Sequence, residues 1–269
     1  ATAAPPAAPA AGAPAAPPAA PAAVPVHPAN YASLFCFSVM QLNTEEENLL
    51  KFQLKKQCSI FACDEPAVIS KEKVLLGHTK WGPVYTWKAP VKAEAMGKYG
   101  IGGATTNSYL NTWEFIKAWD SLMESGLLWK HQFIVKVDPD AVFFPDRLHG
   151  IVQPHVGQAM YFTNCGKYAD GPKLYGSIEV FSKEAIQTYE QQAKACKALP
   201  WRGTWGEDYY MQKCMDEVLH VPGVFDADLV GDDNCVPAAC TDWKKAAFHA
   251  KKAVGLYESC LATATSPSP

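Results

Sequence analysis

The order of apolar and polar positions from residue 34 onward predicts alternating strands and helices. Leu34–Met40 is a short, nearly continuous apolar run, typical of a strand covered on both faces. Thr44 and the three glutamates after it form a capping pattern that opens a helix. Ser59–Ala62 predicts a second strand, which we expect to stop regular pairing at Pro66 because proline has no backbone donor. Strand, helix and strand within about thirty residues predict a βαβ unit and therefore a parallel sheet.

The rest of the chain continues the mixed pattern without an internal repeat. The segment 77–104 is rich in glycine and predicts a loop region. An aromatic stripe at helical spacing follows it and predicts a helix that packs on the core and ends at Gly126. Further strands are expected at Phe133–Val137, Ala159–Thr163 and Ile178–Phe181. Further helices are expected at 183–197, after a Ser182 cap, and at 207–219. We therefore predict an α/β fold with a mixed, mostly parallel sheet flanked by helices.

Composition divides the chain into three parts. Residues 1–28 contain 14 Ala and 9 Pro with no carboxylate, Lys or Arg. Such a stretch cannot bury an apolar core, and its prolines exclude a continuous helix, so we expect a semi-rigid, extended arm that could contact a protein partner. Residues 29–262 are expected to form one domain and residues 263–269 a flexible tail.

Charge and missing motifs narrow the class of function. The net charge of −3 and pI near 6.2 argue against a nucleic-acid surface. No run approaches the ~20 apolar residues of a membrane span, so we expect none in this chain. Residues 1–28 also lack the features of a signal peptide, so for a secretory protein we expect a missing anchor, a removed leader or a soluble lumenal location. Neither a P-loop nor a GxSxG motif occurs, which disfavours P-loop enzymes and serine hydrolases.

The nine cysteines favour disulfides. They include no CxxC pair and no zinc-like spacing, so an oxidising lumen or an extracellular location is the preferred interpretation. The alternative is that some of them, Cys36 above all, are buried thiols. An odd number leaves at least one cysteine unpaired within the chain.

The strongest chemical signal is a pair of carboxylates, Asp138 and Asp140, at the end of the predicted strand 133–137. Ligands bind at the carboxyl ends of strands in open α/β sheets, and two close carboxylates repel unless a cation or proton lies between them. We therefore predict a divalent metal ion that bridges to a diphosphate. Asp and Pro are also common in the turn after a strand, and this alternative stays open.

Two motifs resemble those of glycosyltransferases with the GT-A fold. The strand, the Asp-Pro-Asp sequence and the apolar run after it resemble the metal motif of that fold. The segment Trp205–Cys214 resembles the Glu-Asp motif of the fringe-like and beta-3-galactosyltransferase-like inverting families, and the nearest likeness is to expanded families in unicellular algae. The resemblance implies a GT-A-like domain in which Asp208 is the general base, with Glu207 beside it. Both acids could instead only stabilise a helix N-terminus.

Further site residues follow from the same resemblance. His249 resembles the late histidine that binds the metal in many GT-A enzymes, and an imidazole ligand favours Mn²⁺ over Mg²⁺. Lys251 or Lys252 could neutralise the diphosphate, and Asp64 could accept hydrogen bonds from the base or ribose. The alternatives are a structural histidine, solvated lysines and ordinary turn chemistry.

These residues imply metal-dependent transfer of a sugar from a nucleotide-sugar donor to the hydroxyl of a glycan or protein acceptor, with inversion. Because a fold does not fix a function, a catalytically inactive, glycosyltransferase-like scaffold within a larger assembly is the competing interpretation.

Overall fold

The computed structural model describes residues 31–91, 96–99, 104–109, 111–200 and 205–266. The predicted Ala/Pro-rich arm, residues 1–28, lies outside them, so its extended form and its partner stay predictions.

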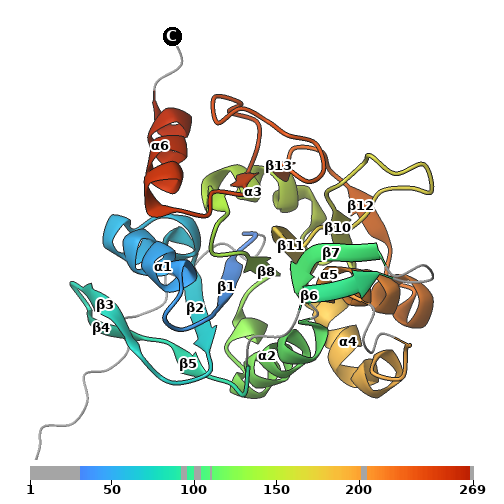
Figure 1. Cartoon of the computed structure of the whole chain (residues 1–269). Helices are drawn as coiled ribbons and strands as arrows, with labels where there is room; N and C mark the ends of the chain where they lie inside the picture. The colour runs from blue at the N-terminus through green and yellow to red at the C-terminus, as the bar shows by residue number, and fades with distance from the viewer. Residues whose placement is uncertain (1–30, 92–95, 100–103, 110, 201–204, 267–269) are drawn as a thin grey trace, which may run out of the picture.

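A seven-stranded sheet forms the centre of the domain (Figure 1). Its order is β12-β10-β11-β8-β1-β2-β5. Strand β1 is parallel to both of its neighbours, β2 and β8, and the outer pairs β2-β5 and β10-β12 are also parallel. Strand β11 is antiparallel to both of its neighbours. The predicted mixed, mostly parallel sheet is therefore confirmed. The strands are β1 (Leu34–Met40), β2 (Glu65–Ser70), β5 (Trp87–Lys88), β8 (Phe133–Val137), β10 (Tyr161–Thr163), β11 (Ile178–Ser182) and β12 (Gly223–Phe225).

The first βαβ unit exists, but its second strand lies later in the chain than expected. Helix α1 (Glu45–Lys56) begins at Thr44, whose side chain accepts from the amide of Glu46. The predicted strand Ser59–Ala62 is wrong, because this short apolar run forms a 3₁₀ helix, η1, that packs into the core. Pro66 lies inside β2, where only β1 pairs beside it, so its missing N–H breaks no ladder bond to β5.

Helices cover both faces of the sheet because the side chains of a strand alternate between its faces. Phe35 and Phe37 of β1 pack with α2 (Thr112–Ser125), α4 (Lys183–Cys196) and α5 (Glu207–Lys213). Leu34 and Cys36 pack on the other face with α1 and α3 (Pro145–Val152). The predicted ends of two helices are confirmed, since Gly126 (φ 73°) closes α2 and the Ser182 hydroxyl caps α4. Helix α5 continues as the π-helical turn η4 (Cys214–Leu219). Short 3₁₀ turns η2 (Leu128–Lys130) and η3 (Gln153–His155) complete this part of the chain.

A small second sheet lies beside the carboxyl ends of the central strands. Its order is β13 (Val230–Asp232), β14 (Ala247–His249) and β9 (Val142–Phe143). Helix α6 (Val254–Thr265) packs beside α1 (Figure 1) and also contacts β9. It extends past residue 262, where we expected the domain to end.

The predicted loop region 77–104 contains strands instead. Hairpin β3-β4 (Leu75–Thr79 and Gly82–Tyr85) lies in it, and β6 (Met96–Tyr99) pairs with β7 (Ala104–Tyr109). Gly77, Gly82, Pro83 and Gly97 lie within these short strands. Because glycine and proline are more typical of turns, the composition of the segment hid the pairing.

Four disulfides confirm that the cysteines are mostly paired. They are Cys36–Cys63, Cys165–Cys235, Cys196–Cys214 and Cys240–Cys260. Cys36 is therefore not a buried thiol, and Cys58 is the unpaired one. Disulfides persist in oxidising environments, so their number supports a lumenal or extracellular location. Among the described helices, none combines the length and apolar character that crossing a bilayer requires.

Candidate metal centre and neighbouring acidic site

The two aspartates lie on a tight turn at the carboxyl end of β8. The amide of Ala141 donates to the carbonyl of Asp138, 3.0 Å away, with Pro139 at the second turn position, where its fixed φ is favourable. Helix α1 holds the turn from one side, because the side-chain amide of the buried Gln53 donates to the Pro139 carbonyl at 2.7 Å. This turn presents Asp138 and Asp140 at the sheet edge, as the sequence predicts.

The small sheet brings His249 to this turn. Strand β14 pairs with β9 so that Phe248 lies opposite Val142, two residues beyond Asp140. One ligand atom each of Asp138, Asp140 and His249 lies within 4.8 Å of the others. Their side chains are 30%, 16% and 12% exposed, so the group is only partly covered. Two carboxylates and an imidazole are a donor set that suits a divalent first-row metal ion, and these residues fit the predicted group.

The charges of His249 and Asp140 shift each other's pKa values. Burial opposes the imidazolium, but hydrogen bonds to Asp140 and Asp232 outweigh it and raise the pKa of His249 to about 10. Burial also opposes ionisation of Asp140, yet the hydrogen bond and charge of His249 hold the pKa of that carboxyl below its usual value. A metal ion would therefore replace a proton on His249, since the ligand form is neutral imidazole.

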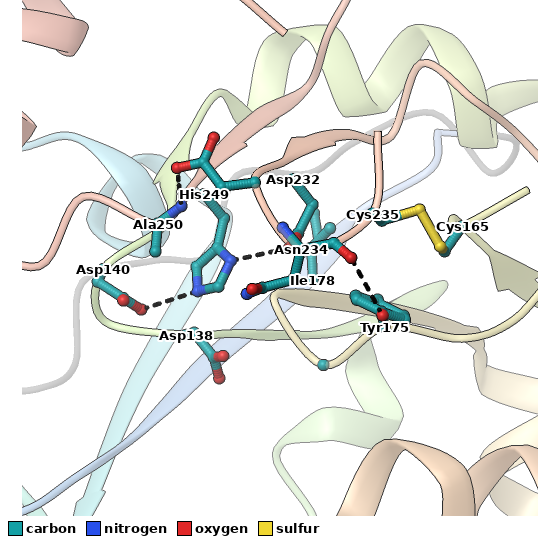
Figure 2. A network of polar contacts seen from close by, with 12 residues as sticks. Asp138, Asp140, Cys165, Tyr175, Ile178, Asp232, Asn234, Cys235, His249 and Ala250 are labelled. Carbon is teal, nitrogen blue, oxygen red and sulfur yellow. Dashed lines mark hydrogen bonds and ion pairs between the residues drawn. A yellow bond between two sulfur atoms is a disulfide. The ribbon is translucent and has the colours of Figure 1, made fainter. Parts of the chain in front are cut away.

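Asp232 is a neighbour of the site that the sequence did not single out. It is 1% exposed, and its Oδ2 lies 2.8 Å from His249 Nδ1, while Nε2 lies 3.3 Å from Asp140 Oδ1. Figure 2 shows the imidazole between the two carboxylates. Asp232 stands opposite His249 in the parallel pair β13-β14, a register that no local pattern reveals.

A buried charged cluster lies on the other side of Asp138. Lys136 is 4% exposed, and its Nζ is 2.9 Å from Asp138 Oδ1, 3.1 Å from Glu179 Oε1 and 3.7 Å from Glu207 Oε2. Lys136 and Glu179 are directly opposite each other on β8 and β11. Burial and the nearby Glu207 raise the pKa of Glu179 well above its usual value. A charged residue inside each of two apolar strands was the sequence signal for this pair.

Asp208 lies at the start of α5 and is partly exposed. Its Oδ2 accepts from the Gly176 amide at 3.1 Å, and its Oδ1 accepts from the Tyr209 amide at 2.8 Å. Burial and the charge of Glu207 raise the pKa of Asp208 to about 6. This value leaves a carboxylate that is ionised at neutral pH and more basic than an ordinary aspartate.

Glu207, which we predicted beside the base, is more deeply buried than Asp208. It is 3% exposed, and its Oε1 accepts from the indole N–H of the buried Trp119 at 3.0 Å. Its other oxygen faces Lys136. The structure thus places Glu207 inside the protein, where it anchors α5 to α2, and leaves Asp208 as the acid with exposed surface.

Asp64 lies at the other end of the sheet from the metal site. It precedes β2 instead of ending the second strand, and its Oδ2 accepts from the Leu34 amide at 2.7 Å. Because β1 and β2 are parallel to β8, this position is at the amino edge of the sheet, opposite Asp138. The expectation that Asp64 contacts the nucleotide depended on the wrong strand assignment.

Lys251 and Lys252 do lie near the metal turn. The amide of Lys251 donates to the Asp140 carbonyl at 2.8 Å, and its Nζ is 3.5 Å from Asp233 Oδ2. The charge of Lys252 helps to lower the pKa of Asp140. On the other flank, burial raises the pKa of Glu46 to about 7, with the charges of Asp138 and Asp140 adding to it. The sequence assigned the glutamates of that segment only to helix capping.

Comparison with known proteins identifies the fold. No protein-family model matches the sequence, and neither does any curated protein. The crystal structure of a glycosyltransferase involved in the glycosylation of the major capsid of PBCV-1 is similar, with a TM-score of 0.52 and 12% identity over 85% of this chain and 98% of that chain. At this identity the similarity shows the fold alone. The chain therefore has a glycosyltransferase fold of the GT-A-like type, as predicted.

Weaker structural similarities exist to two further proteins. One is a cytidylyltransferase from Leptospira borgpetersenii (TM-score 0.40, 14% identity, 73% of this chain and 76% of that chain). The other is the glycosyltransferase GlyE of Streptococcus pneumoniae (TM-score 0.39, 7% identity, 72% of this chain and 45% of that chain). These two similarities are too weak to assign a property to this chain. The finer resemblance to fringe-like and algal families stays a prediction.

Proposed function

We propose that this chain transfers a sugar from a nucleotide-sugar donor to a hydroxyl of a glycan or protein acceptor, in a reaction that depends on a divalent metal ion and inverts the sugar carbon. The observation that carries the proposal is the convergence of Asp138, Asp140 and His249 at the carboxyl edge of the sheet. Three oxygen and nitrogen donors from two sheets meet there on a glycosyltransferase fold. The four disulfides further support an oxidising lumen or the cell exterior as its location.

Asp138, Asp140 and His249 would hold the ion, which when bound supplies positive charge for the departing nucleoside diphosphate. The imidazole favours Mn²⁺ over Mg²⁺. Lys251 and Lys252 would add positive charge beside the diphosphate. Asp208 would take the proton of the acceptor hydroxyl, since its pKa of about 6 suits a general base near neutral pH.

Binding of Mn²⁺ together with UDP and a panel of nucleotide sugars tests the proposal. We expect a thermal shift that requires both the metal and the nucleotide, and its loss in Asp140→Asn. The matched control is Asp170→Asn, which removes a 75% exposed carboxylate that pairs with Lys173 and should leave the shift unchanged. A nucleotide response that persists in EDTA, or in Asp140→Asn, would contradict the metal assignment.

A second function, an inactive scaffold, is favoured by one observation. The Lys136 ammonium already neutralises Asp138, 2.9 Å away, so the protein supplies a cation of its own at one ligand. In that case Mn²⁺ and nucleotides would give no shift, and the chain would co-purify with a large partner.

A further inference from the structure

The function proposed above assigns no role to the buried carboxylate of Asp232. Asp232 is 1% exposed, and burying a carboxylate requires that partners satisfy it. Its Oδ1 accepts from the Asn234 amide at 2.8 Å, and its Oδ2 lies 2.8 Å from His249 Nδ1. Both oxygens therefore have partners, and one of these partners is a candidate metal ligand.

The fold around Asp232 fixes its position from several directions. Its amide donates to the Val236 carbonyl at 3.0 Å and closes a short loop after β13. Cys235 in that loop is bonded to Cys165 (Figure 2). The preceding residue, Gly231, has space for no side chain, because a Cβ there would lie 2.4 Å from the Cβ of Ala238. The carboxylate is thus held by rigid surroundings.

We propose that Asp232 is a positioning residue for the metal site. By accepting the Nδ1–H of His249, it fixes the ring so that the Nε2 lone pair faces the space between Asp138 and Asp140. A histidine that binds a metal usually donates its other N–H to a carboxylate or carbonyl, and loss of that partner typically weakens metal binding 10–100-fold. The inference rests on the proposed metal-dependent function and assigns a role that Asp232 plays through His249.

The variant Asp232→Asn removes the charge and keeps the size of the side chain. Its neighbour gives a matched control, Asp233→Asn, because the Asp233 carboxylate bonds the Ala250 amide and Lys251 but not the imidazole. We expect Asp232→Asn to raise the Kd for Mn²⁺, measured by calorimetry, by about 10–100-fold. The control should change it by less than about threefold, since its carboxylate does not orient a ligand.

Two further measurements separate positioning from general damage. The nitrogen coupling in the Mn²⁺ spin-echo spectrum reports imidazole ligation directly, and it should weaken in Asp232→Asn at saturating Mn²⁺. In a His249→Ala background, Asp232→Asn should have no further effect on Mn²⁺ affinity, because its action runs through the ring. Should Asp232→Asn not fold, Asp232→Glu keeps the charge and moves the carboxylate by one methylene, and it should also weaken Mn²⁺ binding.

The outcomes distinguish this inference from the proposed function. If the wild-type chain binds no Mn²⁺, the metal site fails and the role of Asp232 fails with it. If the wild type binds Mn²⁺ and both Asp232 variants bind it equally well with an unchanged nitrogen coupling, only the role of Asp232 is overturned.

Discussion

Replacing Lys136 by Met tests whether the buried cation at the edge of the sheet stabilises the fold. Methionine is an unbranched side chain one atom shorter than lysine, and it removes the ammonium. In the wild type this group is 4% exposed, lies 2.9 Å from Asp138 and 3.1 Å from Glu179, and donates to the Gly176 carbonyl at 2.6 Å. A thioether replaces none of these interactions.

The expected loss follows from the charges that remain. Removing one partner of a buried ion pair typically costs about 3–5 kcal/mol, because the other charge is left uncompensated. Glu179 already has a raised pKa and can take up a proton, so the loss should fall near the lower end, about 3 kcal/mol. For a chain of this size, about 2–4 °C per kcal/mol gives a fall in Tm of about 6–12 °C.

The loss should also grow with pH. An acid whose pKa is raised in the folded state contributes its full stability below its unfolded pKa, and that contribution is lost as the pH rises through the folded pKa. Without Lys136, the positive charge that opposes the upward shifts of Asp138 and Glu179 is gone. We therefore expect a larger destabilisation at pH 8 than at pH 5, where these carboxyls can hold protons.

Guanidinium unfolding in EDTA, followed by tryptophan fluorescence with the disulfides intact, measures the effect. Lys194→Met on the exposed side of α4 is the control and should stay within about 0.5 kcal/mol of the wild type. Adding Glu179→Gln to Lys136→Met should recover part of the loss, because it removes a buried charge. A loss below about 1 kcal/mol at both pH values, or one that shrinks as the pH rises, refutes the reasoning.

Three other predictions concern the proposed base Asp208, the glycine before its helix and the Cys165–Cys235 disulfide. The rate of sugar transfer should rise with pH through about 6 as Asp208 loses its proton, and a pH profile that is flat from 5 to 8 would contradict its role as the base. Gly206→Ala should lower the rate without changing Mn²⁺ affinity, because a Cβ there would lie 2.9 Å from Asp208 Oδ1; equal rates in the two proteins would show that the carboxylate can move freely. Replacing Cys165 and Cys235 by Ala opens a disulfide that spans 70 residues, for which chain entropy predicts a loss of about 4 kcal/mol in the free energy of unfolding, measurable by denaturation.

Structural features that depend on a few neighbouring residues could be predicted from the sequence more readily than contacts between distant segments. The turn that carries Asp138 and Asp140 was predictable, because an apolar strand running into Asp-Pro-Asp determines its own geometry. The same local logic located the capped starts of α1 and α4. It failed at Ser59–Ala62, since a run of four apolar or small residues fits a strand and a buried turn equally well.

Contacts between distant segments were beyond the sequence patterns. The pairing of Asp232 with His249 depends on the register of two short parallel strands 17 residues apart. The pairing of Lys136 with Glu179 joins strands more than 40 residues apart. In the second case a signal was present, because a lone charge within an apolar strand requires a buried partner. The sequence indicates that such a partner exists but not which residue it is.

Lys136 also joins the two halves of the proposed active site. Its ammonium contacts one oxygen of Asp138, which leaves the other oxygen for a cation, and it donates to the carbonyl of Gly176. The amide of the same glycine donates to Asp208. Asp138 and Asp208 are therefore linked through one buried cation and one backbone residue.

If this connection carries function, Lys136→Met changes both halves together. Below its unfolding temperature the variant should bind Mn²⁺ more tightly, because the ammonium that neutralises Asp138 and repels a second cation is gone. Its rate profile should also rise at a higher pH than that of the wild type, because the charge of Lys136 lowers the pKa of Asp208. A change in Mn²⁺ affinity with an unmoved pH profile would show that the ammonium acts on the metal ligand alone and that the pKa of Asp208 depends on its backbone donors.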